Sequence, residues 1–216
     1  MAKLEWDKTG ERFYQLGVSN GVLFPQTKGG AYGTGVAWNG LTGVTASPDG
    51  AEPNDLHADN FKYGSIWSAE TFGMTIKAYT YPDEFAACDG SAEVAPGVYL
   101  GQQKRTPFAF SWQSLIGNDT EGQDAGYILH LVWGATAKPS DQDYESVNNN
   151  PDAIEFSWEC DTNPVKVAGR RATAHMELNS LKVNTAKLEQ LLNKLYGTAN
   201  TAPTMPSVEE VIKMFS

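Results

Sequence analysis

The sequence predicts a mainly β protein: an antiparallel β-sandwich or barrel with one flanking α-helix, long loops and a C-terminal arm. Two observations predict this class. Four separate segments alternate between apolar and polar residues, and helical spacing occurs only in the C-terminal part of the chain. With 216 residues, 41% of them apolar, the chain can bury a core without disulfides or a metal. We expect one domain over residues 1–197, with residues 1–16 as an N-terminal arm and 198–216 as a C-terminal arm that carries a short helix.

The alternating segments carry an apolar residue at every second position, which places those side chains on one face of a β-strand. They span residues 72–79, 108–113, 154–160 and 172–178. We expect the apolar faces to point into the core and the polar faces into solvent. Weaker strand candidates lie at residues 35–44 and around Ile66 and Trp67.

The segment from Tyr127 to Trp133 is apolar on both faces, because Ile128 and Val132 stand where a half-buried strand carries polar residues. This pattern predicts a central strand that is covered on both sides. Turn-forming residues fill positions 117–126, so we expect this strand and segment 108–113 to form a hairpin with a long loop.

Leucines at positions 188, 191, 192 and 195 have the spacing of one helix face, so the sequence predicts a helix over about 184–196, capped by Asn184 or Thr185 and stopped at Gly197. Ser207 and Glu210 form a capping box that begins a second, shorter helix. A single helical turn is expected at residues 82–85, because proline suits its first position and acidic residues its first turn.

Two connections are long for such a domain, residues 47–65 and 82–105, and we expect both to be functional loops. Much of the charge lies in this region. Residues 49–93 hold nine acidic residues and two lysines, a local charge of −7 out of a formal −10 for the chain.

The net charge argues against a protein that grips nucleic acid, since phosphate affinity comes from basic groups that release counterions. No apolar run of about 18 residues predicts a transmembrane helix. The first residues lack the apolar run and cleavage site of a signal peptide, so we expect synthesis and retention in a cytoplasm. There, Cys88 and Cys160 are expected to remain inert thiols.

No motif predicts catalysis. The three histidines are His57, His130 and His175, and the last two stand on strand positions that face away from the apolar stripe of their own strand. The glycine cluster at residues 29–35 lacks the Lys-Ser/Thr of a phosphate-binding loop. We therefore predict no enzyme, no catalytic, metal or cofactor-binding residue and no cofactor. Two alternatives stay open: a carbohydrate-binding or adhesin-like β-sandwich of a virion or cell surface, and, as the weaker one, a hydrolase with opposed carboxylates such as Asp83 with Glu84.

From about Gly17 to the C-terminus, the chain resembles the major tail tube proteins of bacteriophages with long, non-contractile tails (siphovirus type). The resemblance rests on several short segments taken together. These are residues 35–41 (GVAWNGL), 46–53 (ASPDGAEP), 58–60 (ADN), 68–70 (SAE), 78–85 (AYTYPDEF) and 116–122 (IGNDTEG).

The resemblance implies a structural virion protein that self-assembles into stacked hexameric rings, forming the tail tube through which the genome passes into the host. It implies location in the virion tail after assembly in the host bacterial cytoplasm. The implied partners are further copies of the chain, the tail tip and tail terminator proteins, and a tape measure protein inside the tube. DNA would pass through without specific binding, and no membrane is involved.

Two sets of site residues follow from this hypothesis. We expect Pro53, Leu56 and Phe61 to make contacts between rings, because these apolar residues have no periodic reason to lie in segment 47–65. A wall of carboxylates offers DNA no phosphate neutralisation, so acidic residues are expected to line the bore. The candidates are Asp83, Glu84, Glu155, Glu159 and Glu177.

Overall fold

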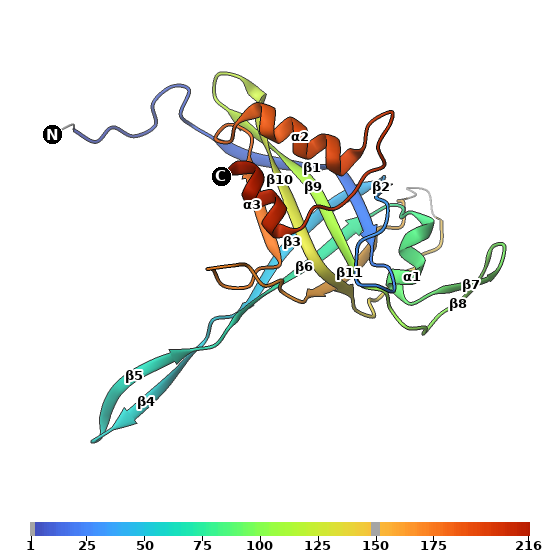
Figure 1. Cartoon of the computed structure of the whole chain (residues 1–216), viewed down its shortest axis with the longest axis horizontal. Helices are drawn as coiled ribbons and strands as arrows, with labels where there is room; N and C mark the ends of the chain where they lie inside the picture. Colours follow the sequence, from blue (N-terminus) through green and yellow to red (C-terminus); the bar gives the residue numbers. More distant parts are fainter. Residues whose placement is uncertain (1–2, 148–151) are drawn as a thin grey trace.

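The computed structural model describes residues 3–147 and 152–216 as strands layered under helices (Figure 1). The strands are β1 (Tyr14–Pro25), β2 (Val36–Trp38), β3 (Leu41–Gly50), β4 (Pro53–Ala58), β5 (Phe61–Trp67), β6 (Glu70–Ala78), β7 (Ala92–Ala95), β8 (Val98–Leu100), β9 (Phe108–Asn118), β10 (Gly122–Ala137), β11 (Phe156–Thr162) and β12 (His175–Asn179). The helices are a 3-10 turn η1 (Asp83–Phe85), α1 (Ala86–Asp89), α2 (Thr185–Tyr196) and α3 (Val208–Phe215).

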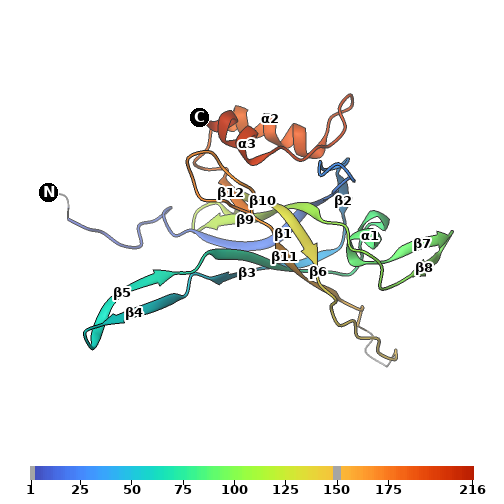
Figure 2. The same cartoon turned by 60° about the horizontal axis from the view of Figure 1, so that its bottom comes forward.

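The main sheet has the strand order β2-β1-β9-β10-β11-β6-β3, with β12 also paired to β10, and every pairing is antiparallel. The sheet bends along β10, whose middle pairs with β9 and β12 and whose last residues pair with β11. Its two halves therefore form two layers (Figure 2). The predicted mainly β, antiparallel class is confirmed.

One hydrophobic core fills the space between the two halves of the sheet. Its centre is aromatic: the rings of Trp38 and Trp158 lie 5.5 Å apart, and Phe85 packs 4.5 Å from Trp38 and 5.1 Å from Trp158. Tilted and edge-to-face contacts at these distances are the arrangements that aromatic pairs prefer.

A second core lies between the opposite face of β1, β9, β10 and β12 and the helices α2 and α3. Leu129, Leu131 and Trp133 of β10 point into it, while Val132 points into the first core. The prediction that this strand is covered on both sides is confirmed.

The helices also change the environment of β9, where Ala109, Ser111 and Gln113 were expected to face solvent. All three are buried, because this face lies in the helix-covered layer. The expectation of an outward polar face on this strand is therefore wrong: its short or amide side chains lie under the helical layer instead.

Both predicted helices form where their caps indicate. The Asn184 side chain accepts a hydrogen bond from the backbone N–H of Lys187, and Leu188, Leu191 and Leu195 are buried. At α3 the capping box of Ser207 and Glu210 is complete. None of the described helices is long and apolar enough to cross a membrane.

The segment 198–216 packs against the domain. Val208 and Val211 of α3 are buried in the second core, and the indole N–H of Trp133 donates to the carbonyl oxygen of Pro206 at 2.9 Å. In the single chain, this segment is therefore part of the helical layer and does not project as an arm.

Replacing Ser207 by alanine removes the oxygen that accepts the backbone N–H of Glu210 at 3.2 Å. We expect the free energy of unfolding to fall by about 1 kcal/mol, measured by urea denaturation. Ser207→Asp retains an acceptor and serves as the control, with an expected change of less than ~0.5 kcal/mol. Equal stability of the alanine variant and the wild type would show that the cap contributes nothing.

Two local features differ from the sequence-based expectation. Strand β1 was not predicted, because register shifts between Leu16 and Ser19 and between Ser19 and Val22 break its alternation. The expected long loop at 117–126 is also wrong. Strand β9 continues to Asn118 and β10 begins at Gly122, because the Asn118 side chain accepts hydrogen bonds from the backbone of Thr120 and Glu121 and closes a tight turn.

Candidate functional site

Strands β4 and β5 form a two-stranded ribbon that projects from the body of the domain (Figures 1 and 2). At its tip, Asp59 and Asn60 connect the paired residues Ala58 and Phe61. Both turn residues have positive φ angles, 49° and 66°, which define the two-residue turn that matches the twist of a hairpin. The expectation that residues 47–65 form a loop is therefore wrong, since they belong to β3, β4 and β5.

A short joint at Gly50 and Ala51 connects the ribbon to the sheet. Gly50 and Ala51 have positive φ angles of 83° and 54°, and a Cβ atom on Gly50 would collide with the carbonyl oxygen of Ala69. Across the joint, the backbone N–H of Ser68 donates to the carbonyl oxygen of Glu52 at 3.0 Å. Only glycine fits the first position, so the sequence itself determines the direction in which the ribbon leaves the domain.

The ribbon exposes large apolar side chains. Tyr63 is 73% exposed, Trp67 65% and Phe61 58%, and all three residues lie on β5. Leu56 and Ile66 are exposed as well. All three residues expected to contact a neighbouring ring, Pro53, Leu56 and Phe61, lie on this ribbon and are exposed.

A second projecting hairpin consists of β7 and β8 and lies at the opposite end of the molecule in both views (Figures 1 and 2). Its exposed apolar residues are Val94, Val98, Tyr99 and Leu100. The expected loop at 82–105 is therefore also wrong, because it contains η1, α1 and this hairpin. The predicted helical turn at residues 82–85 is confirmed by η1.

Arg105 anchors the end of that segment. Its guanidinium lies 3.3 Å from the Asp89 carboxylate and donates to the carbonyl oxygen of Ala137 at 3.1 Å. Burial raises the pKa of Asp89, and the Arg105 charge opposes that shift. The base of the β7–β8 hairpin is therefore tied to the end of β10.

The described residues before β1 form no strand or helix. Leu4 and Trp6 are largely exposed, and the segment is held to the domain where the N–H of Gly10 donates to the Asp119 carboxylate at 3.0 Å. The predicted N-terminal arm, residues 1–16, includes two residues that lie outside the described part of the chain and the first three residues of β1.

The structure does not bring the five predicted bore carboxylates together. Asp83 and Glu84 lie in η1, next to the β7–β8 hairpin. Glu155 directly precedes β11, Glu159 lies on β11, and Glu177 lies on β12 in the other half of the sheet.

Lysines accompany the two carboxylates near β11. Lys77 lies 3.5 Å from Glu155, and Lys138 lies 3.0 Å from Glu159 and 2.8 Å from Asp161. These exposed pairs reduce the negative potential of that surface, an effect that sequence alone could not show because the lysines come from β6 and from the segment after β10.

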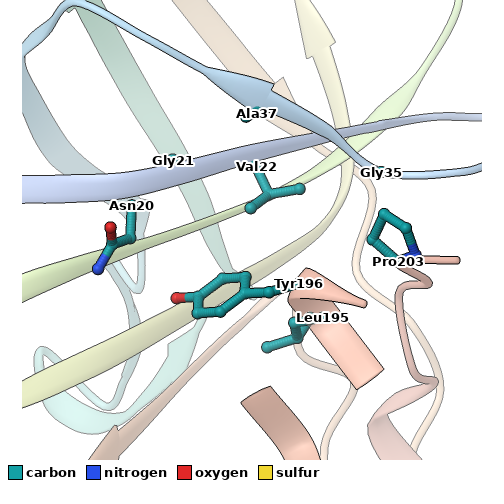
Figure 3. Close-up of a pocket in the computed structure, with 8 residues that line it drawn as sticks. All are labelled: Asn20, Gly21, Val22, Gly35, Ala37, Leu195, Tyr196 and Pro203. Atoms are coloured by element: carbon teal, nitrogen blue, oxygen red, sulfur yellow. The ribbon is translucent and has the colours of Figure 1, made fainter. Parts of the chain in front are cut away.

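A largely apolar cavity of about 220 Å³ lies between β1, β2 and the end of α2 (Figure 3). The Gln113 amide donates to the Tyr196 hydroxyl at 2.9 Å and accepts from Asn20 at 2.8 Å, so the polar groups at its rim are already paired. Burial raises the pKa of Tyr196. The described lining residues include no carboxylate, histidine or cysteine.

Cys88 and Cys160 are both buried as free thiols. Burial raises the pKa of each to about 12. Neither forms the thiolate needed for reactivity at neutral pH, in agreement with the sequence-based expectation.

His130 and His175 lie on different predicted strands, but their side chains are neighbours in the structure. The ring of His130 stacks on Trp112 at 4.7 Å and that of His175 on Phe72 at 4.4 Å. They do face away from the apolar stripe of their own strands, as expected, but the other half of the sheet covers that side too. The sequence signal that could have revealed this is the apolar pattern on both faces of residues 127–133, which already predicted that this strand is covered on both sides.

Burial lowers the pKa of His130 to about 4, with a further lowering by His175 that the Glu177 carboxylate opposes. In the unfolded chain the ring titrates near pH 6.5. Between about pH 6.5 and pH 4, the unfolded state therefore binds more protons than the folded state. The stabilising effect of the neutral ring is complete above this window and is lost within it.

With a chelator present, we expect His130 to account for a loss of about 2 kcal/mol of unfolding free energy between pH 7.5 and 4.5, after allowance for solvent at the open side of the ring. Urea denaturation of the wild type and of His130→Gln at both pH values isolates this contribution from that of the carboxylates. Identical pH dependence of the two proteins would contradict the prediction.

No protein-family model matches the chain, and no curated protein sequence matches it.

Proposed function

We propose that this protein is a structural subunit of a siphovirus-type tail tube, which assembles in the host cytoplasm into stacked hexameric rings and conducts the genome through the virion tail. The resemblance of residues 17–216 to major tail tube proteins motivates the proposal. The observation that carries it is the pair of apolar hairpins, β4–β5 and β7–β8, at opposite ends of the molecule. The proposed role is structural and involves no catalysis or cofactor.

Projecting apolar elements at opposite ends favour head-to-tail association. A contact between two different surfaces repeats without closing on itself along an axis, which is the symmetry that a stacked tube needs. A two-stranded ribbon is at best marginally stable alone, and exposed apolar groups of this extent mark interaction surfaces. We infer that β4–β5 gains its stability by packing against the adjacent ring.

The layering supports one orientation of the subunit in the ring. Helices α2 and α3 cover one side of the sandwich, while no helix or further strand of the described residues covers the outer face of β3, β6 and β11 (Figure 2). In the proposed tube this uncovered face lines the bore. The edge of β3 that is not paired with β6 then offers backbone groups to a neighbouring subunit.

The charge on this face suits passage of DNA. Glu155, Glu159 and Asp161 face two lysines, Lys77 and Lys138, so the named groups leave one excess negative charge per chain. With its ammonium groups already paired, the wall has little capacity to neutralise phosphates and hold DNA. A map of the tube with a strongly basic bore would contradict this part of the proposal.

The test is negative-stain electron microscopy of the concentrated full-length protein, with sedimentation as a parallel measurement. We expect rings, or hollow tubes of uniform bore, made of stacked sixfold rings. A chain that stays monomeric at every concentration, or forms only closed dimers, would contradict self-assembly into a tube. Tail tip, terminator and tape measure proteins remain the proposed partners in the complete tail.

One observation favours a second candidate, a carbohydrate-binding or adhesin-like β-sandwich. Phe61, Tyr63 and Trp67 are exposed aromatic residues of β5, and exposed aromatic rings can stack on sugars. A glycan array with the wild type and with Trp67→Ala distinguishes the two functions. Binding that depends on Trp67, without any tube formation, would support this alternative.

A further inference from the structure

The three side chains of His130, His175 and Glu177 form a cluster of donor atoms at the open side of the sandwich. The register of β10 and β12 places them there, because His130 pairs directly with Glu177 and His175 stands two residues before Glu177. Residues two apart on one strand share a face, and directly paired residues on neighbouring strands do too. The backbone alone thus brings three potential metal ligands to one face.

The donor atoms form a compact triangle. Nδ1 of His130 lies 3.4 Å from Nε2 of His175 and 3.5 Å from a carboxylate oxygen of Glu177, and the third edge measures 3.9 Å. Ligands bonded to a tetrahedral zinc ion at their usual bond lengths are separated by roughly 3.4 Å. Two edges therefore match one face of a zinc coordination sphere, and the third is about 0.5 Å longer, a difference that a side-chain movement of Glu177 would close.

Neighbouring groups hold the ligands as they do in metal sites. Nε2 of His130 lies 3.0 Å from the Ser114 hydroxyl, and a hydrogen donated there leaves the lone pair of Nδ1 facing the other two donors. Trp112 and Phe72 stack on the two imidazoles and limit their rotation. Such outer contacts, which set the tautomer and the ring orientation, are usual for histidines that bind metals.

Space for a further ligand lies beside the triangle. The three residues line a cavity of about 370 Å³ whose other walls come from β1, β3 and β9, including Gln15, Thr42 and Ser114. A water molecule could complete the coordination sphere from this side. Two imidazoles and one carboxylate suit zinc and its neighbours in the first transition series, whereas calcium and magnesium prefer oxygen ligands alone.

We propose that His130, His175 and Glu177 bind a divalent transition-metal ion of the zinc class, which links the short strand β12 to β10. The proposal concerns the single chain and does not depend on assembly into a tube. Within the described part of the chain, β12 pairs with β10 alone, so an ion shared by both strands would strengthen that connection.

The test is calorimetric titration of ZnCl₂ into the full-length protein after removal of metals with a chelator, at neutral pH. We expect one ion per chain and an increased melting temperature when zinc is present in excess. Glu177→Gln is expected to weaken binding at least about 10-fold, and His175→Ala to abolish it. Co²⁺ replaces Zn²⁺ in a second titration, where its visible d–d absorption reports the coordination geometry of the bound ion.

His57→Ala is the matched control, because His57 lies exposed on β4, far along the ribbon from the cluster. It should bind zinc as the wild type does. If His175→Ala fails to fold, as judged by circular dichroism, Glu177→Gln carries the test, since the Glu177 side chain is 55% exposed. No zinc binding by the wild type, or equal binding by wild type and Glu177→Gln, would overturn the proposal and leave a hydrogen-bonded histidine pair.

Discussion

Replacing residues 53–67 by an Asn-Gly turn is expected to yield a folded monomer that no longer forms tubes. The change removes the β4–β5 ribbon and connects Glu52 to Ser68 by a tight hairpin turn. These two residues are already joined by backbone and side-chain hydrogen bonds of 3.0 and 2.9 Å, so the sheet closes without distortion. None of the residues in either hydrophobic core belongs to the removed segment.

Electron microscopy and sedimentation measure the loss of assembly, and circular dichroism checks the fold. A less drastic variant combines Phe61→Ser, Tyr63→Ser and Trp67→Ser, which keeps the ribbon but removes its largest apolar surface. The matched control is Tyr144→Ser, because Tyr144 is 72% exposed but lies outside both hairpins. Tubes of normal length from the triple variant would show that the ribbon does not hold the rings together.

Replacing Trp158 by alanine is expected to lower the free energy of unfolding by about 3 to 5 kcal/mol. Trp158 is fully buried, and its ring contacts those of Trp38, Phe85, Tyr81 and Phe156 at centroid distances between 5.1 and 5.7 Å. It connects β11 to both β2 and η1, so the surrounding rings cannot collapse into the cavity without moving several elements. A domain has only about 5 to 15 kcal/mol of stability, so this single change removes much of it.

Urea denaturation gives the loss directly. Trp67→Ala is the control, because it removes the same side chain from an exposed position of the ribbon and should change the stability by less than ~0.5 kcal/mol. A loss of less than about 1 kcal/mol for Trp158→Ala would mean that this aromatic cluster is not a cooperative centre of the core.

The sequence best predicted the strands and helices that have one buried face and one exposed face. The strands around Met74 and Trp158 have one face in the first core, and α2 has one leucine stripe in the second, so their patterns are visible in the chain. It failed for β4, β7 and β8 and located only the end of β5, around Ile66 and Trp67, because a hairpin that is exposed on both faces has no reason to alternate. It failed for β1 because bulges shift its pattern.

The candidate assembly surface could also be predicted only in part from the sequence. Pro53, Leu56 and Phe61 could be selected from the sequence because apolar residues stood in a segment without periodicity. That Tyr63, Ile66 and Trp67 belong to the same surface required the pairing of β4 with β5. The opposite position of the β7–β8 hairpin required the whole fold.

By itself, the sequence determined the mainly β class, the two capped helices and the acidic excess, since each depends on local periodicity, capping or composition. Only the tertiary structure decided that β10 is covered by two different layers, that lysines accompany Glu155 and Glu159, and that His130, His175 and Glu177 meet. These facts depend on register and layering between segments far apart in the chain, and such contacts leave no periodic trace in any one segment.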